Sequence, residues 1–154
     1  MSLHLESPAF GQGEPIPRKY SCEGENISPP LRWSGVPPGT EELLLVCDDP
    51  DAPGGVFHHW AVYNIPADST GLAEGFGPES LVNGLHQAVN DFGKPGYAGP
   101  CPPPGGGDHH YHFRLSALSE RIVSAGSSAT CVEVMTLARP HVLEFVELIG
   151  IFRR

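Results

Sequence analysis

Alternation of apolar and polar residues predicts that the middle of this chain forms β-strands. The clearest case is residues 110–118, where apolar and polar side chains alternate with the period of two that is typical of a strand. Residues 42–48 form an apolar run that ends at two aspartates, and residues 56–65 form a second run that ends before a proline. Shorter extended segments are expected around residues 3–5 and 31–33. We therefore expect a protein dominated by short strands.

The rest of the pattern predicts one helix, one further strand and a long connection. Residues 67–95 are rich in Gly, Asn and Asp without clear periodicity, and we expect a long ordered loop there. Residues 127–130 offer N-caps for a short helix over about residues 130–140. Residues 142–152 are apolar and β-branched enough for a last strand. No repeat or second domain is visible, so residues 1–154 are expected to form a single domain.

Composition narrows the class of protein. The chain has 154 residues, of which 40% are hydrophobic and 18% charged, as expected for a globular domain with one core. Its 19 glycines and 17 prolines interrupt long helices and favour an all-β dominated fold with shaped loops. The formal net charge of −9, with only 9 Lys and Arg, argues against binding to nucleic acid or to anionic membrane surfaces.

The chain start and the cysteines predict a location. Residues 1–6 lack the basic and apolar regions of a signal peptide, and no apolar run is long enough to cross a membrane. We therefore expect a cytoplasmic protein without stable membrane anchoring, whose four cysteines are reduced. Cys47 and Cys131 lie in apolar segments and are expected in the core. Cys22 and Cys101 lie in loops, where a Cys22–Cys101 bridge or a reactive Cys101 thiol is the alternative.

Candidate chemistry is concentrated in two stretches, residues 49–60 and 99–113, which are rich in proline and glycine. Prolines fix their own φ angles and glycines let the backbone approach a bound group, so polar side chains on such loops lose little entropy on binding. Seven side chains there suit a charged ligand: Asp49, Asp51, His58, His59, His109, His110 and Tyr111.

Strand parity divides these side chains. Three sets of alternate residues each share a strand face: Leu43, Leu45, Cys47 and Asp49; Phe57, His59, Ala61 and Tyr63; His109, Tyr111, Phe113 and Leu115. The polar members, Asp49, His59, His109 and Tyr111, lie at strand ends and are expected to converge at one rim of the core. The alternative is a chance match in which they cap strand ends in solvent. His58, His110 and His112 have the opposite parity and are expected to face solvent or scaffold.

In these motifs the chain resembles the phosphatidylethanolamine-binding protein family, in its bacterial Raf-kinase-inhibitor-like branch. The similarity covers nearly the whole chain, and the similar segments occur in the family's order: residues 7–10, 16–17, 20–22, 26–33, 49–53, 58–60, 90–93, 96–97, 99–103, 109–111, 141–143 and 147–150. One motif alone would be weak evidence, whereas all of them in order are specific.

The resemblance implies a β-sandwich of a large antiparallel sheet and a smaller sheet, with a short C-terminal helix and strand. It also implies a pocket for phosphate or a phospholipid head group, with no cofactor, a kinase or protease as the kind of protein partner, and a homodimer. By position, Asp49, His59, His109 and Tyr111 would bind the ligand, and the lining would be Pro53, Phe57, Gly99, Cys101, Pro102 and Pro103. Phe57 stands where eukaryotic members often have Trp. The chain ends at Arg154 without the helix that covers the pocket mouth in animal members, which puts contacts with lipid tails in doubt.

The residue types fit this reading. Protonated His59 and His109 supply donors and positive charge to an anion, and the Tyr111 hydroxyl adds a neutral donor. Residues 99–101 are expected to direct backbone N–H groups at the anion, as in a nest. Asp49 is expected to hold one histidine in a single tautomer and keep it protonated, or to meet a protonated phosphate oxygen.

Other residues are expected to serve the scaffold. Asp51 is expected to cap the turn over residues 50–55 through local backbone N–H groups. Trp60 and Tyr63 are expected in the core, and His86 on the surface.

Two other functions remain open. A metal site could draw on Asp49, Asp51, His58, His59, His109 and His110, but neighbouring strand residues point to opposite faces and fit a shared ion poorly. A hydrolase could use His59 or His109 as a base, or Cys101 as a nucleophile near His109. No nucleophile elbow, phosphate-binding loop, zinc-protease motif or dinucleotide motif is present. We therefore expect a non-catalytic binding protein.

Overall fold

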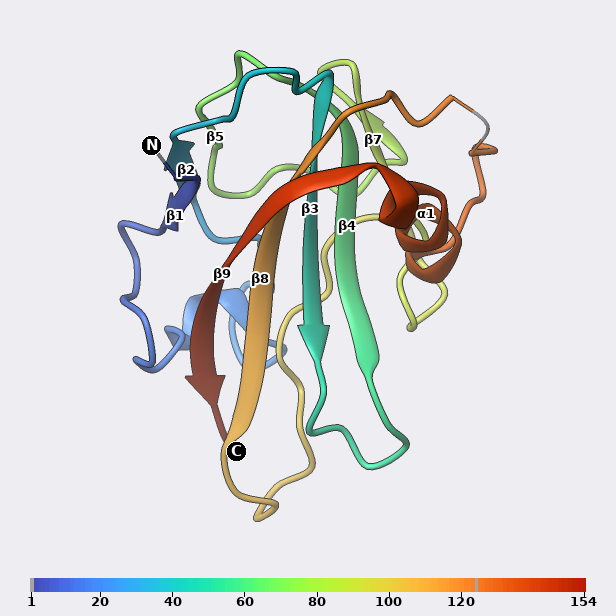
Figure 1. Ribbon diagram of the computed structural model, residues 1–154. Coiled ribbons are helices and arrows are strands. Elements are labelled where there is room, and N and C mark those ends of the chain that lie inside the picture. Colours follow the sequence, from blue (N-terminus) through green and yellow to red (C-terminus); the bar gives the residue numbers. More distant parts are fainter. Residues whose placement is uncertain (1, 124) are drawn as a thin grey trace.

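The computed structural model describes residues 2–123 and 125–154, and they form two antiparallel sheets. The large sheet contains, in spatial order, β6 (Leu81–Val82), β7 (Leu85–Gln87), β4 (Phe57–Pro66), β3 (Glu42–Asp49), β8 (His109–Leu118) and β9 (Val142–Phe152). The small sheet contains β1 (His4–Glu6), β2 (Leu31–Ser34) and β5 (Gly71–Leu72). The helices are α1 (Cys131–Ala138) and two 3₁₀ turns, η1 (Arg18–Tyr20) and η2 (Arg139–His141). This is the fold that the family resemblance implied (Figure 1).

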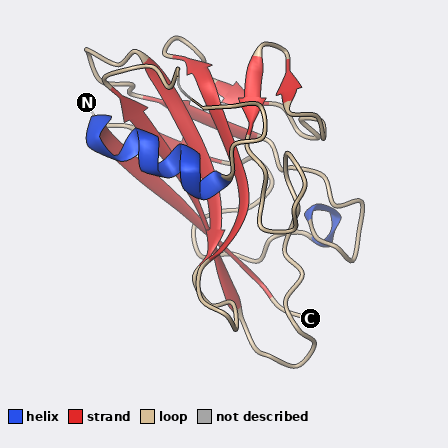
Figure 2. Ribbon diagram, turned by 90° about the vertical axis from the view of Figure 1, so that its right-hand side faces the viewer, coloured by secondary structure: helices blue, strands red, loops and turns tan. Residues whose placement is uncertain are grey.

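Both faces of the large sheet are covered, because apolar residues occur at odd and even positions of its central strands. One core lies against the small sheet and joins Leu5 and Trp33 to Leu45 and Phe113. A second core lies under α1. Figure 2 shows α1 on one side of the sheet and η1 on the other. Strand β3 runs between these two cores, and each of its residues is buried.

The helix begins where the hydroxyl-rich segment predicted it. The Thr130 side chain accepts a hydrogen bond from the Glu133 backbone N–H, and the Glu133 carboxylate accepts one from the Thr130 N–H, which forms a capping box. The helix ends at Ala138, two residues before Pro140, and η2 follows. No helix among residues 2–123 and 125–154 is long and apolar enough to cross a membrane.

The expectation of a loop throughout residues 67–95 is wrong, because β5, β6 and β7 lie there. These strands have two or three residues, too few to show a period. The sequence did carry a hairpin signal: Asn83 and Gly84 join β6 to β7 with positive φ angles of 51° and 82°, as a two-residue primed turn requires.

The parity prediction for β4 is wrong beyond His59. Cys47 pairs with Trp60 while Asp48 pairs with His58, so His59 is the extra residue of a β-bulge. As a result, Trp60 packs in the core against the small sheet, and Ala61 belongs to the core under α1. Tyr63 lies in the same core as Ala61, so both aromatic residues expected to be buried are buried.

The expectation of four reduced cysteines is wrong for two of them. Cys22 and Cys101 form a disulfide, whereas Cys47 and Cys131 are free and buried. Residues 20–26 and 97–101 run side by side, which brings the two loop cysteines to a Cα separation of 5.4 Å. The prediction of a cytoplasmic protein rested partly on reduced thiols, and it stays a prediction.

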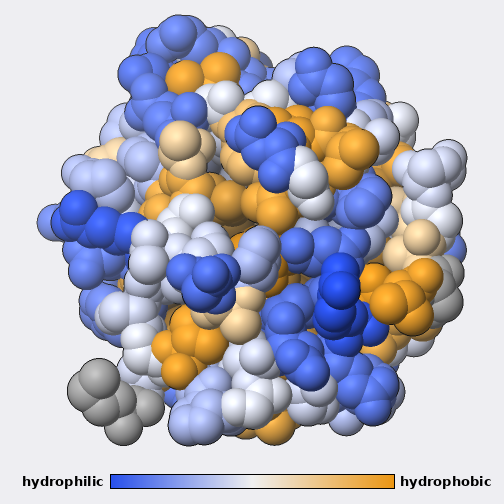
Figure 3. Space-filling model, turned by 90° about the horizontal axis from the view of Figure 1, so that it is seen from above, coloured by the Kyte–Doolittle hydropathy of each residue, from blue (hydrophilic) through white to orange (hydrophobic). Residues whose placement is uncertain are grey.

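The two ends of the molecule differ. Seen from above, the end that carries the β3 start shows apolar side chains in separate groups between polar ones (Figure 3). The opposite end carries the two proline- and glycine-rich loops that follow β3 and precede β8 (Figure 1). The candidate chemistry lies at that end.

Candidate functional site

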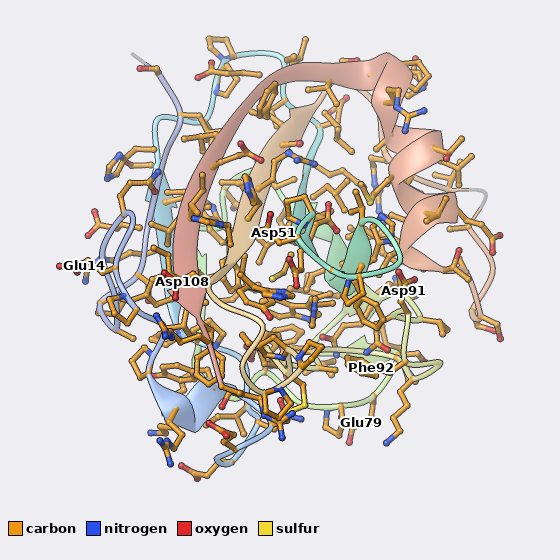
Figure 4. The ribbon with its side chains drawn as sticks, turned by 90° about the horizontal axis from the view of Figure 1, so that it is seen from below. Glu14, Asp51, Glu79, Asp91, Phe92 and Asp108 are labelled. Atoms are coloured by element: carbon orange, nitrogen blue, oxygen red, sulfur yellow. A yellow bond between two sulfur atoms is a disulfide. The ribbon has the colours of Figure 1, made fainter. Side chains whose placement is uncertain are left out.

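A cavity of about 220 Å³ opens at the end of the large sheet where β3 stops and its two neighbours start. Strands β4 and β8 both run antiparallel to β3, so the end of β3 at Asp49 meets the starts of β4 at Phe57 and of β8 at His109. The cavity is lined by Asp49, Ala52, Pro53, Phe57, His59, Phe92, Cys101, Pro102, Pro103, His109 and Tyr111. Figure 4 looks into this end: Asp51, Phe92 and Asp108 lie on three different loops around its centre.

A buried aspartate orients the first imidazole. The Oδ2 atom of Asp49 lies 2.7 Å from Nδ1 of His109, and its Oδ1 atom accepts a 2.8 Å hydrogen bond from the Asp51 backbone N–H. Both side chains of the pair are almost completely buried. A carboxylate accepts, so it favours the tautomer in which His109 Nδ1 carries the proton. This places Asp49 in the tautomer-holding position that we expected for it.

A backbone carbonyl orients the second imidazole. His59 Nδ1 lies 2.6 Å from the carbonyl oxygen of Ala98, which can only accept, so Nδ1 carries the proton. Burial lowers the pKa of His59, and the hydrogen bond to Ala98 and the charge of Asp49 only partly oppose the shift. Burial alone therefore favours the neutral imidazole of His59, and the positive charge that we expected there requires a nearby anion.

The phenol of Tyr111 lies between the imidazoles. Its ring centre is 5.3 Å from that of His59 and 6.5 Å from that of His109. Burial, followed by the charge of Asp49, raises the pKa of Tyr111 above its usual range. The hydroxyl therefore stays protonated and can donate a hydrogen bond to an oxyanion.

An aromatic wall closes one side of the cavity. The centre of the Phe92 ring lies 4.6 Å from the centre of the Phe57 ring and 5.8 Å from the centre of the His59 ring. A turn holds Phe92 in place, because its N–H donates to Oδ1 of buried Asn90 at 2.9 Å. Ala52 and Pro53 extend the apolar lining.

All the predicted pocket residues line this cavity except Gly99. A Cβ at Gly99 would meet the Tyr20 carbonyl oxygen at 1.9 Å, so the glycine allows a close backbone approach behind the wall. Its N–H donates to Asn26 Oδ1 at 2.7 Å, and Pro100 has no N–H. The expectation that residues 99–101 form a nest for an anion is therefore wrong at these two positions.

Sequence reasoning missed Phe92 and Ala52. The sequence did carry a signal for Phe92, which is a lone aromatic residue between Asp91 and Gly93. In the structure its side chain is 49% exposed. Ala52 lies inside the 49–53 motif, where a small apolar side chain gave no chemical cue.

The prediction that Asp51 caps the turn over residues 50–55 is wrong. Its Oδ2 atom accepts a hydrogen bond from the His110 N–H and lies 2.8 Å from His110 Nδ1, so Asp51 ties the loop after β3 to β8. The local capping bond expected of Asp51 is made by Asp49, which accepts from the Asp51 N–H. Asp51 and His110 lie outside the cavity lining, in agreement with their predicted scaffold role.

The histidines of opposite parity lie away from the cavity and contact carboxylates. His58 Nδ1 is 2.9 Å from Asp91, and its Nε2 is 4.0 Å from Asp48. Oδ1 of Asp48 has no hydrogen-bond partner among the described residues, and burial raises the pKa of Asp48 to about 6. His112 pairs with Glu147.

His86 lies outside the cavity lining. His86 is only half-exposed, because its ring stacks on Tyr63 and its Nδ1 lies 2.8 Å from Asn64 Oδ1. Within residues 2–123 and 125–154, no three His, Cys, Asp or Glu side chains are arranged to hold a metal ion. Cys101 is bonded to Cys22, so in this structure it has no free thiol to act as a nucleophile.

The whole length of the chain corresponds to a known family. The family model described as phosphatidylethanolamine-binding protein matches residues 6–153. The chain belongs to the phosphatidylethanolamine-binding protein family. It is 47% identical over 154 residues to a UPF0098 protein of Methanothermobacter thermautotrophicus, with 99% of each chain covered.

Two further similar proteins are one with a solved structure and one that is named as a lipoprotein. The crystal structure of E. coli YbcL, described as a new member of the mammalian PEBP family, is 34% identical and superposes with a TM-score of 0.93, covering 100% of this chain and 99% of that one. A putative lipoprotein, LppC of Mycobacterium tuberculosis, is 50% identical over 116 residues, which are 75% of this chain and 55% of LppC.

Proposed function

We propose that the cavity binds a small oxyanion of the phosphate type, either free or as the head group of a phospholipid. The observation that carries the proposal is the arrangement of the two imidazoles. His59 and His109 both use Nδ1 for an acceptor of the protein, Ala98 O and Asp49 Oδ2 respectively. Neither Nε2 has a hydrogen-bond partner among the described residues, and both rings line the same cavity.

The donors of this cavity suit an oxyanion that either carries a proton itself or causes an imidazole to take one up. When protonated, each imidazole presents an N–H at Nε2, and the Tyr111 hydroxyl is a third donor. The described residues that line the cavity include no Lys or Arg. The balancing charge would therefore come from a proton, either carried by the ligand or taken up by an imidazole, and a bound anion would raise the pKa of His59, which burial lowers.

Size restricts the ligand. The volume of about 220 Å³ is below the range of about 300–1,000 Å³ that is usual for sites of drug-sized ligands. A phosphate group and a few attached atoms fit, whereas acyl chains would have to remain outside. Binding, and not nucleophilic catalysis, is proposed, because the described residues that line the cavity include no Ser, Thr or free Cys side chain. A kinase or protease partner and a homodimer stay predictions from the family resemblance.

The test is a titration with inorganic phosphate, followed by NMR of the imidazole resonances. We expect the His59 and His109 signals to shift together and to saturate, while the signal of exposed His4 stays in place. His59→Gln and His109→Gln should each weaken binding by at least about tenfold, since each removes a charge-assisted hydrogen bond worth about 1.5–3 kcal/mol. His4→Gln is the matched control. Imidazole signals that do not move at saturating phosphate would overturn the proposal.

A further inference from the structure

One wall of the cavity is fixed to the rest of the protein by a disulfide. Cys101 lines the cavity, and so do the two prolines that follow it, Pro102 and Pro103. Cys101 is bonded to Cys22, which lies 79 residues away in the N-terminal segment. The bond is visible in Figure 4 at the end of the molecule where the cavity opens. Any change in this bond therefore acts directly on the binding surface.

The non-covalent contacts of the wall are distributed unevenly around Cys101. Before it, the Gly99 N–H donates to Asn26 and the Cys22 N–H donates to Pro100 O at 3.0 Å. After it, residues 102–107 bond to a single distant residue among those described, Arg154. Its Nη1 donates to Pro102 O at 3.3 Å, and its carbonyl accepts from the Gly105 N–H at 3.0 Å. The disulfide is thus the main fixed point where the well-held part of the wall meets the weakly held part.

The disulfide is accessible and chemically asymmetric. Both cysteines are exposed. Nη1 of Arg154 lies 3.4 Å from the sulfur of Cys101, where it would stabilise a thiolate, and Nε of the same guanidinium lies 3.5 Å from the carboxylate of Glu23, the residue after Cys22. Thiol–disulfide exchange is faster when the leaving sulfur is the better stabilised thiolate. Attack on the sulfur of Cys22, with Cys101 as the leaving group, is therefore the favoured route.

We propose that the Cys22–Cys101 disulfide is a redox latch that holds the cavity wall and that its reduction weakens anion binding. The reductant is a dithiol, either a small molecule or a dithiol oxidoreductase. Its thiolate bonds to Cys22 Sγ, the Cys22–Cys101 bond breaks, and Cys101 leaves as a thiolate beside Arg154. The second thiol of the dithiol then displaces Cys22. The protein gains two electrons and two protons in total, and the dithiol becomes a disulfide.

Reduction lowers anion affinity because it frees the wall. The freed wall has to be ordered again when the ligand binds, and ordering the backbone of about one residue costs about a factor of ten in affinity. This inference rests on the proposed anion binding, so the experiment needs one readout that does not involve a ligand.

The ligand-free readout is hydrogen exchange of the Gly105 N–H, whose bond to Arg154 O reports on the wall. We expect exchange to become faster when the intact protein is reduced with dithiothreitol and to slow again on reoxidation. The Cys22→Ser/Cys101→Ser double variant should exchange fast with or without reductant. Unchanged exchange at Gly105 on reduction would overturn the latch, whatever the ligand does.

The second readout is phosphate affinity of the oxidised and the reduced protein. Faster exchange together with about tenfold weaker binding supports the whole proposal. Faster exchange with equal affinity overturns the gating of binding. If phosphate binds in neither state, the proposed function is wrong. The exchange result alone then decides whether the disulfide holds the wall.

The direction of attack has its own test in two adjacent arginines. Arg154→Gln should slow reduction by dithiothreitol severalfold, because Cys101 becomes a poorer leaving group. Arg153→Gln is the matched control, since Arg153 lies 3.5 Å from Asp108 and not at the disulfide. Equal reduction rates in the two variants would contradict the assigned leaving group.

Discussion

Replacing Asp49 by Asn tests the pair on which the geometry of the cavity depends. The carboxylate accepts two hydrogen bonds, one at each oxygen, from His109 Nδ1–H and from the Asp51 N–H. An asparagine has the same shape but only one acceptor oxygen. Whichever way its amide is turned, one of the two donors faces an NH₂ group.

The size of the effect follows from these contacts. Losing a charge-assisted hydrogen bond costs about 1.5–3 kcal/mol, and leaving a buried donor without a partner costs about 1–3 kcal/mol. The two costs overlap, because the same donor is counted in both. We therefore expect Asp49→Asn to lower the free energy of unfolding by about 2–4 kcal/mol. With a urea m-value of about 2 kcal/mol/M, the urea midpoint should fall by about 1–2 M.

Asp108→Asn is the control for this measurement. Asp108 is also an aspartate at the cavity end of the molecule, but it is exposed and pairs with Arg153 at 3.5 Å (Figure 4). Exposed pairs contribute about 0–1 kcal/mol, so this variant should unfold almost like the wild type. If both variants lost the same small amount of stability, the structural argument for Asp49 would be refuted.

Three further predictions concern single positions. Sulfate does not titrate near neutral pH, so the pH dependence of its binding reports on the protein. It should bind about tenfold more tightly for each unit that the pH falls while His59 takes up one proton, and calorimetry of His59→Gln should show no such slope. A slope that persists in the variant would assign the proton to another group. Gly99→Ala should cost at least about 3 kcal/mol in urea unfolding, because its Cβ would lie 1.9 Å from Tyr20 O, whereas Gly54→Ala, which meets nothing within 4 Å, should change stability by less than about 0.5 kcal/mol. Burial raises the pKa of Asp48 to about 6, above its unfolded value of about 4, so the ionised form destabilises the folded state and stability is gained as pH falls between these values. Asp48→Asn should therefore be more stable than the wild type by about 3 kcal/mol at pH 7 and equal to it at pH 4, and a difference independent of pH would contradict this.

The elements that sequence reasoning predicted well are those whose pattern extends over many residues. The alternation in β8 is regular over residues 110–117, so its core face follows from parity, and the same parity places His109 on that face at the start of the strand. The same holds for β3, where the run of buried residues ends at Asp49. Because both neighbours of β3 are antiparallel to it, the end of β3 and the starts of β4 and β8 meet at one end of the sheet, and so do their polar groups. Convergence of the cavity residues was therefore predictable.

The features that escaped prediction depend on single residues or on contacts between distant segments. The bulge at His59 inserts one residue into β4 and exchanges the faces of Trp60 and Ala61, and no periodicity signals one extra residue. The disulfide depends on the approach of two loops that are 79 residues apart. Asn64, in β4, has a positive φ of 61° where Leu44 faces two residues, a second irregularity of the same strand.

The bulge at His59 is itself what makes the cavity possible. In a regular strand, the side chain next to Trp60 would point to the opposite face of the sheet. With His59 as the extra residue, the centre of its ring lies 5.3 Å from that of Tyr111 on the cavity side, and Trp60 still fills the core behind it. The same strand end thus supplies both a buried aromatic anchor and a ligand-facing imidazole.

Charge then determines what kind of ligand such a cavity can take. The chain carries a net charge of −9, and the acidic residues around the cavity mouth include Asp51, Asp91 and Asp108 (Figure 4). An extended anionic surface would meet all of this charge at once, whereas a single small anion meets mainly the local donors of His59 and Tyr111. Salt screens the long-range repulsion over about 10 Å at 0.1 M, but it leaves the buried contacts nearly unchanged. We therefore expect the proposed phosphate-type ligand to enter as a separate molecule, and we do not expect docking to an anionic bilayer.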